Sequence, residues 1–270
     1  MADSKIETKK KMLMSMSSLG LVYSGKGGKE QNTTALEQVD LTIYEGDFIC
    51  VLGPSGCGKS TLLNIMAGLM EATSGTIEMD GEPVKGVDAK RAVVFQTPTL
   101  YPWMDVYSNI AFGPKVRKVE NEVIEQRIDK YLKLIGLEEF AHVKPYELSG
   151  GMRQRVALAR AIVNDPKMIL LDEPFGALDA FTRNSMQDLI RKIWKKDRTT
   201  IFLITHDVDE ALTLGTRIIT MSARPGRVLK EFDVDFTLRM NDSQEDARYS
   251  PEYIELRKEI LKLIGLGQEK

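Results

Sequence analysis

Gly53-Pro54-Ser55-Gly56-Cys57-Gly58-Lys59-Ser60-Thr61 is the stretch around which the rest of this 270-residue chain is arranged. It fits the pattern G-x-x-x-x-G-K-[ST], in which glycines let successive backbone N–H groups point at phosphate oxygens. An apolar run, Phe48 to Leu52, precedes it and suits a buried strand, and apolar residues at near-helical spacing follow it. The N-terminus of that helix presents partial positive charge to the same anion. The stretch 53–61 is therefore predicted to bind a nucleoside triphosphate, with Lys59 reaching the terminal phosphates and the Ser60 hydroxyl binding Mg²⁺.

Composition limits the classes of protein that fit. A chain with 43% hydrophobic residues can bury a large core, as one domain or as one domain with a subdomain. The net charge of −2 gives no basic field, so we expect no nucleic-acid partner. No apolar run reaches the roughly 18 residues that a membrane helix needs, so work at a membrane would require a partner. Cys50 and Cys57 are expected to be reduced, as in a cytosolic protein.

The N-terminus offers two readings. Lys9 to Lys11 followed by Met12 to Met14 superficially resembles a signal sequence, but serines interrupt the apolar run. We therefore expect a flexible tail over residues 1–14, with the first strand starting at Ser15. A loop is expected from Gly25 to Thr34.

Strand and helix patterns alternate along most of the chain. Strands are expected at 15–23, 36–43, 48–52, 76–79, 91–95, 168–171, 201–204 and 218–221, and helices at 182–196 and 207–214. This alternation predicts an α/β fold with a mainly parallel sheet covered by helices. Helical patterns fill residues 97–165, which reads as an insertion into the α/β core. A helix starting at Ser250-Pro251-Glu252 forms a C-terminal extension, 241–270.

Two carboxylates follow the apolar strand at 168–171. Strand ends in such sheets are where ligands bind. Adjacent side chains on extended backbone diverge, so Asp172 and Glu173 are expected to do different work. Asp172 suits Mg²⁺, and Glu173 suits polarising a water aimed at the γ-phosphate.

Leu148-Ser149-Gly150-Gly151-Met152 decides between families of triphosphate-binding proteins. Ser149, Gly150 and Gly151 open a helix and create a second anion-binding helix N-terminus in the same chain. This pentapeptide is similar to the signature of ATP-binding-cassette (ABC) nucleotide-binding domains, and its place before the acidic strand matches as well. The resemblance covers roughly residues 15–230. It implies a P-loop NTPase (RecA-like) core with an antiparallel β-subdomain and a helical subdomain, about 97–165, within a domain spanning 15–240.

The resemblance also assigns roles to further residues. Tyr23 takes the place of the aromatic side chain that stacks on adenine. Gln96 resembles the glutamine that touches Mg²⁺ and the attacking water. Asp179, in Ala177-Leu178-Asp179, resembles the loop that crosses the dimer interface, and His206 resembles the histidine that contacts the γ-phosphate. Catalysis would then rest on Glu173, His206, Gln96 and Lys59.

In this family two domains sandwich two ATP molecules head to tail, so the implied partner is a second copy or a paralogous ATPase. Ser222 to Val228 resembles a turn of the ATPases of nitrate, sulfonate and taurine importers. The apolar and aromatic stretch 87–112 lies where a permease would dock. These features imply an importer subunit at the cytoplasmic face of the inner membrane, held there by a transmembrane permease and fed indirectly by an extracytoplasmic substrate-binding protein.

Two alternatives remain at this level. An exporter or lipid-transport ATPase shares the core motifs, although the Arg224-Pro225-Gly226 turn argues against it. A soluble cassette acting on DNA or ribosomes usually has a long coiled coil or a second cassette, whereas only residues 61–147 separate the two motifs here. The solute itself, for example nitrate, a sulfonate, taurine or bicarbonate, is left open by the sequence.

Overall fold

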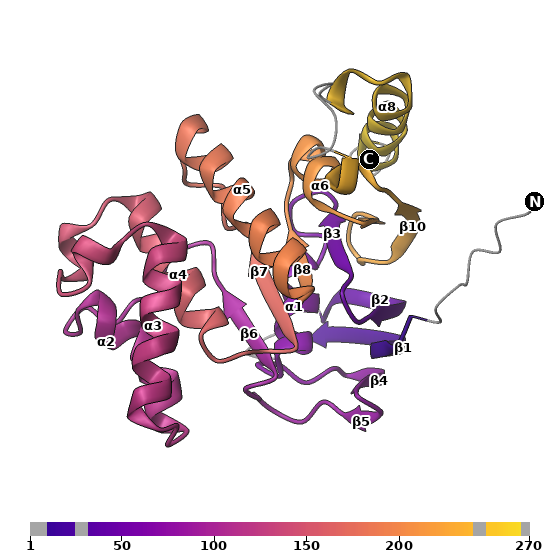
Figure 1. Cartoon of the computed structure of the whole chain (residues 1–270). Coiled ribbons are helices and arrows are strands. Elements are labelled where there is room, and N and C mark those ends of the chain that lie inside the picture. Colours follow the sequence, from indigo (N-terminus) through magenta and orange to yellow (C-terminus); the bar gives the residue numbers. More distant parts are fainter. Residues whose placement is uncertain (1–9, 25–31, 240–246, 266–270) are drawn as a thin grey trace, which may run out of the picture.

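A computed structural model describes residues 10–24, 32–239 and 247–265. The described residues leave out part of the expected N-terminal tail (1–9), part of the expected loop (25–31), residue 240, and part of the expected C-terminal extension (241–246 and 266–270). Figure 1 shows a central sheet with helices on both sides, a second sheet beside it, and a group of helices at one end.

The central sheet has six strands in the order β10-β9-β3-β8-β7-β6. The pairs from β9 to β6 are parallel, and the edge strand β10 is antiparallel to β9. Strands β3, β8 and β9 are buried at every residue, as expected for apolar runs covered on both faces. The α/β fold with a mainly parallel sheet is thus confirmed. The strands are β3 (Phe48–Leu52), β6 (Arg91–Val94), β7 (Met168–Asp172), β8 (Thr200–Ile204), β9 (Arg217–Met221) and β10 (Val228–Asp233).

The second sheet is antiparallel, in the order β2-β1-β4-β5. Its strands are β1 (Met12–Tyr23), β2 (Thr33–Tyr44), β4 (Ser74–Met79) and β5 (Glu82–Pro83). The expectation of a tail as far as residue 14 is wrong at its end, because Leu13 and Met14 are buried and Met14 pairs with Ile43. The loop expected to Thr34 ends earlier for the same reason, since β2 already pairs with β1 at Thr33.

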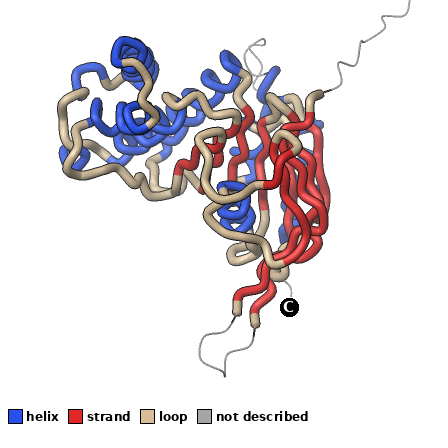
Figure 2. The backbone as a smooth tube through the Cα atoms, turned by 90° about the horizontal axis from the view of Figure 1, so that it is seen from below, coloured by secondary structure: helices blue, strands red, loops and turns tan. Residues whose placement is uncertain are grey.

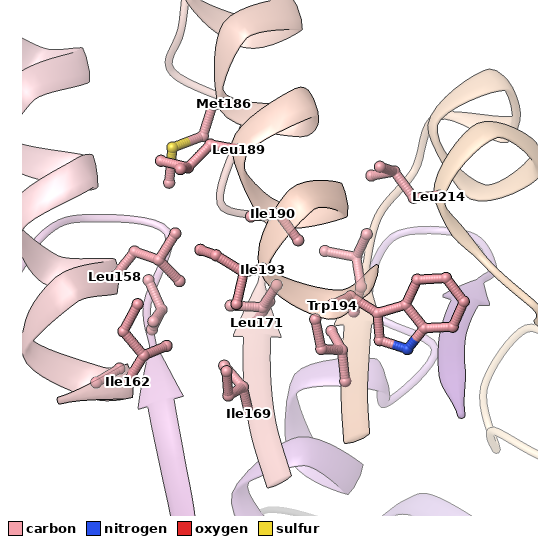
Figure 3. Packing of buried hydrophobic residues seen from close by; sticks show 14 of the residues in the cluster. Leu158, Ile162, Ile169, Leu171, Met186, Leu189, Ile190, Ile193, Trp194 and Leu214 are labelled. Carbon is pink, nitrogen blue, oxygen red and sulfur yellow. The ribbon is translucent and has the colours of Figure 1, made fainter. Parts of the chain in front are cut away.

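Helices α5 (Ala180–Asp197) and α6 (Val208–Leu214) connect strands of the central sheet, and α1 (Lys59–Ala67) leads from β3 of that sheet to β4 of the second sheet. Figure 3 shows that Ile190 and Ile193 of α5 lie near Leu171 of β7, while Leu158 of a neighbouring helix approaches from the other side. All four side chains belong to one buried cluster. Burying a side chain of this size contributes about 1.5–3 kcal/mol, so this cluster fixes α5 on the sheet.

A group of helices, α2 (Val106–Val116), α3 (Asn121–Ile135) and α4 (Gly150–Ile162), packs at one end of the molecule. The tube in Figure 2 shows these helices set apart from the strands of the second sheet. Asp105 caps α2 by accepting a hydrogen bond from the Ser108 N–H at 2.7 Å. Single helical turns at Glu138–Phe140 and Pro145–Glu147 join α3 to α4.

The C-terminal part contains α7 (Phe236–Arg239), a short turn at Ala247–Tyr249, and α8 (Pro251–Gly265). Helix α8 packs against α6, where Tyr253 donates its hydroxyl hydrogen to Asp209 at 2.9 Å. Within the described residues, the structure has no helix of the length and apolar character needed to cross a membrane.

Candidate functional site

The glycine-rich loop connects β3 to α1 at the carboxyl end of the central sheet. Gly58 has a φ of +101°, a backbone conformation that favours glycine. A Cβ atom on Gly58 would lie 2.9 Å from the Ala35 carbonyl oxygen, and one on Gly53 would lie 3.0 Å from that of Met221. Strands β2 and β9 therefore hold the loop so closely that only glycine fits at these two positions. This tight backbone curl is the kind of cradle that binds phosphate.

Lys59 lies within this loop rather than at the surface. Its side chain is only 7% exposed, and its ammonium group donates to the carbonyl oxygens of Gly53 at 2.7 Å and Pro54 at 3.1 Å. The positive charge is thus held over the concave side of the loop. An anion in the cradle would exchange these neutral partners for charged ones, which make stronger hydrogen bonds.

Ser60 and Asp172 meet although they are far apart in sequence. The Ser60 hydroxyl donates to Asp172 Oδ1 at 3.1 Å. Burial raises the pKa of the Asp172 carboxyl, an effect that the Ser60 hydrogen bond partly offsets. A hydroxyl and a carboxylate oxygen side by side are the hard donors that Mg²⁺ prefers. The residues present therefore fit this ion.

Glu173 and His206 form the next pair along the sheet edge. His206 Nδ1 is 3.3 Å from Glu173 Oε2. Glu173 has a φ of +44° and still donates its N–H to the Ile204 carbonyl at 3.0 Å, so the chain turns sharply where β7 ends. The Gln96 amide lies in the same region, because Gln96 Nε2 and Glu173 Oε2 are 3.3 and 3.9 Å from the position that a Cβ on Gly176 would occupy.

Tyr23 lies beside the phosphate loop at the end of β1. Its hydroxyl is 3.1 Å from the Thr61 hydroxyl, and the side chain is 43% exposed. An exposed ring next to the loop has a free face on which a flat base can stack.

The Ser149–Gly151 segment forms a separate group. Ser149 caps α4 by accepting from the Met152 N–H at 3.2 Å, and Asp179 caps α5 by accepting from the Thr182 N–H at 3.0 Å. The two helix starts adjoin, because a Cβ on Gly151 would lie 2.3 Å from Thr182 Cγ2. Helix α4 packs against α2, α3, α5 and β6, whereas α1 packs against β2, β6 and β7. The candidate residues therefore fall into two groups, one around Lys59 and one around Ser149.

Two further charged residues adjoin the site and were not among the predicted site residues. Arg224 Nε donates to the Gly56 carbonyl oxygen at 3.3 Å, so the turn after β9 touches the phosphate loop. Glu210 of α6 is 7% exposed and lines a small cavity together with Glu173 and His206. Burial raises the pKa of the Glu210 carboxyl, which the Thr205 hydrogen bond partly offsets. The sequence offers only a weak signal for Arg224, because the resemblance of its turn points to a subfamily and not to the phosphate loop.

The apolar stretch 87–112 contributes to an open groove of about 470 Å³ on the helical end. Trp103, 68% exposed, stands at this groove. The other lining residues are Met104, Asp105, Ser108, Phe112, Lys115, Val116 and Lys144. The groove thus combines apolar side chains with two lysines.

Comparison with known proteins places this geometry in a family. Residues 36–176 match the family described as ABC transporter. A taurine import ATP-binding protein of Jannaschia sp. is 48% identical over 90% of this chain and 90% of its own length, and one of Pelagibacter ubique is 44% identical over 91% and 93%. A solved dimeric ATP-binding cassette bound to ADP and phosphate is 34% identical and superimposes with a TM-score of 0.72 over 82% of this chain and 99% of its own. A second solved cassette, from Clostridium perfringens, is 26% identical with a TM-score of 0.74 over 93% and 100%. The chain belongs to the ABC transporter family, as an ATP-binding domain with ATPase activity.

Proposed function

We propose that this chain is the ATP-hydrolysing subunit of an importer for taurine or a related sulfonate, and that two copies close head to tail beneath a membrane permease. The observation that carries this proposal is the separation of the two groups of site residues. The phosphate loop precedes α1 and Ser149 to Gly151 start α4, and these two helices pack against different elements apart from β6, which both contact. Each suits half of a site that a second copy completes. The taurine-import names of the relatives support the solute, and the dimeric cassettes support the pairing.

Within one copy, residues 53–61 bind the phosphates of ATP, and the Lys59 ammonium balances their charge. Tyr23 stacks on the adenine. From the second copy, the α4 N-terminus behind Ser149 faces the γ-phosphate, and Asp179 lies at the contact between the copies. The γ-phosphate thus joins the two surfaces, and its loss lets them separate.

Hydrolysis then depends on the group at the end of β7. Glu173 accepts the proton of the attacking water, and Gln96 orients that water. His206 places one ring nitrogen against Glu173 and turns the other toward the γ-phosphate. Ser60, Asp172 and Gln96 would hold Mg²⁺, which would supply positive charge to the phosphate oxygens.

The groove at Trp103 is the docking place that we assign to the permease. The lining combines apolar residues with two lysines, Lys115 and Lys144, and one acid, Asp105, which suits an amphipathic helix that carries acidic residues. Helices of residues 97–165 form the subdomain that moves with the permease, within an ATP-binding domain of 15–240 and followed by the extension 241–270. The protein then works at the cytoplasmic face of the membrane, and a substrate-binding protein on the other side selects the solute.

Glu173→Gln tests the assigned chemistry. The amide keeps the size of the side chain but cannot accept the proton, so the variant should bind ATP, lose hydrolysis, and remain as a closed pair. Phosphate release and size-exclusion chromatography with and without ATP measure these outcomes. Glu45→Gln, at a 42% exposed carboxylate paired with Lys11, is the matched control and should hydrolyse ATP at the parent rate. Hydrolysis by Glu173→Gln at the parent rate would contradict the role of Glu173.

A reconstituted transporter tests the solute and the direction. The chain is combined with its permease in vesicles and supplied with the cognate binding protein and taurine, then with nitrate in place of taurine. Taurine should stimulate ATP hydrolysis and accumulate against its gradient. Stimulation by nitrate alone would reject the sulfonate assignment, and ATP-dependent loss of solute in the opposite direction would reject import.

A further inference from the structure

Glu210 is a buried carboxylate that the chemistry above does not use. It lies on α6, four positions after His206, with 7% exposure. A carboxylate removed from water needs compensating partners. Thr205 donates its hydroxyl hydrogen to Glu210 Oε2 at 2.6 Å, and Gln187 Nε2 donates to Oε1 at 3.2 Å. Glu210 therefore joins two elements, the end of β8 and helix α5.

The hydrogen bond between Thr205 and Glu210 affects the turn that contains His206. The Thr205 hydroxyl also accepts from the Asp207 N–H at 3.0 Å, and the Thr205 N–H donates to the Val51 carbonyl at 3.2 Å. The residues before and after His206 are thus held through one hydroxyl group, whose hydrogen points at Glu210. Moving the Glu210 carboxylate would reorient that hydroxyl and the turn with it.

On the second side, Arg183 links Glu210 to the loop at Asp179. Arg183 Nε lies 3.9 Å from Glu210 Oε1, close enough for attraction but without a hydrogen bond. Arg183 Nη2 donates to the Leu178 carbonyl oxygen at 3.1 Å. Leu178 immediately precedes Asp179, the N-cap of α5. One guanidinium group therefore lies between the Asp179 loop and the buried carboxylate.

A cavity of about 20 Å³ lies among these side chains. Glu173, His206, Arg183, Thr205 and Glu210 all line it. A volume of roughly 10–15 Å³ with polar walls is sufficient for one water molecule. The group around Glu210 is thus directly adjacent to Glu173 and is not a distant structural ion pair.

We propose that Glu210 is a positioning residue that couples the Asp179 loop to His206 through Arg183 on one side and Thr205 on the other. The proposal rests on the proposed function, because it takes His206 as the γ-phosphate contact and the Asp179 loop as the contact with the second copy. Docking of the second copy against Asp179 displaces Leu178, and the displacement passes through Arg183 to Glu210 and then to the turn at His206. The hydrolysis rate in one site then depends on whether the partner is seated, so the two sites hydrolyse ATP cooperatively.

Glu210→Gln tests this coupling, because it keeps the shape and removes the charge that attracts Arg183. We expect kcat to fall about tenfold and the Hill coefficient for ATP to fall toward one, with the KM for ATP unchanged. A residue that only stabilised the fold would not change the Hill coefficient. Asp209→Asn is the matched control, because Asp209 is next to Glu210 but its carboxylate pairs with Tyr253 and Arg257 on α8. The kcat of this variant should stay within about twofold of the parent value.

A double-mutant cycle with Arg183→Gln measures the link itself. If the two side chains act in series, the double variant loses about as much kcat as either single variant, whereas independent effects multiply. If Glu210→Gln does not fold, Thr205→Ser and Thr205→Val test the other end: the serine keeps the hydroxyl and should keep cooperativity, and the valine should lose it.

The outcomes separate this proposal from the function on which it rests. If Glu173→Gln forms the ATP-dependent pair but Glu210→Gln retains the parent kcat and Hill coefficient, the coupling is refuted and the proposed function stands. Multiplicative losses in the double-mutant cycle refute it as well. If Glu173→Gln hydrolyses ATP at the parent rate, the proposed function is refuted, and the coupling that rests on it is refuted with it.

Discussion

Asp47→Ala should destabilise the fold far more than its position in a turn indicates. Asp47 is 1% exposed and accepts hydrogen bonds from Arg217 Nη1 at 2.8 Å and from the Tyr44 N–H at 3.1 Å. Arg217 is itself buried, with a side chain 9% exposed. The variant would leave a guanidinium group inside the protein with one of its carboxylates missing.

The size of the expected loss of stability depends on the hydrogen bonds that Arg217 keeps in the variant. Removing one partner of a buried ion pair costs about 3–5 kcal/mol. Arg217 keeps its bonds to Glu231 at 2.6 Å and to the Thr42 carbonyl at 2.8 Å, which places the loss at the lower end, about 3 kcal/mol. Urea unfolding near neutral pH measures it through the fluorescence of Trp194, which is 1% exposed and donates to the Gly46 carbonyl at 2.9 Å.

The neighbouring pair Lys11–Glu45 provides the control for this experiment. Its side chains are 68% and 42% exposed, so Glu45→Ala should cost less than about 1 kcal/mol. The double variant Asp47→Ala with Arg217→Met should recover part of the loss, because no buried charge is left without a partner. Equal losses for Asp47→Ala and Glu45→Ala would refute the reasoning that burial decides the contribution of these ion pairs.

Two further predictions concern the phosphate loop, and a third concerns the pH dependence of stability. Gly58→Ala should weaken ATP binding by at least about tenfold in a fluorescent-nucleotide titration, because alanine is strained by about 1–3 kcal/mol at a φ of +101°. Arg224→Ala should weaken it only about threefold, in keeping with one exposed hydrogen bond to Gly56, and an unchanged affinity would contradict a role for that contact. The hydrogen bond from Lys167 holds the pKa of Asp80 below its ordinary value of 3.8, so its contribution to stability is present above that value and is lost as the pH falls through the lower, folded-state pKa. Asp80→Asn should therefore flatten the loss of the urea midpoint between about pH 5 and pH 3 relative to the parent.

Much of the fold and of the candidate site can be predicted from the sequence, because the motifs that define them are contiguous in the chain. The cradle at 53–61 is contiguous, and the spacing of strands and helices around it predicted the α/β core that the structure has. The start of β1 was misjudged because lysines precede it, although pairing of Met14 with Ile43 holds that segment in the sheet. Strand β10 was not predicted, since its charged residues look like a solvated turn unless β9 lies beside it.

The roles that sequence did not reveal depend on contacts between distant segments. Arg224 reaches a loop 168 positions earlier in the chain, and the partners of Glu210 on α5 lie 23 and 27 positions before it. A glutamate near the start of a helix resembles an ordinary exposed residue that favours the helix N-terminus. Only tertiary packing shows that it is buried, so no local pattern could have singled it out.

The turn at Glu173 sets stability and activity against each other. A non-glycine residue with a positive φ costs of order 1–3 kcal/mol, and here the cost falls on a side chain that follows another acid directly. The carboxylates of Asp172 and Glu173 have different neighbours, Ser60 for the first and His206 for the second. Selection for a robust fold alone would favour glycine at this position. Under the proposed function, replacing Glu173 to relieve this strain would remove the base for hydrolysis, so stabilisation of this chain should leave it untouched.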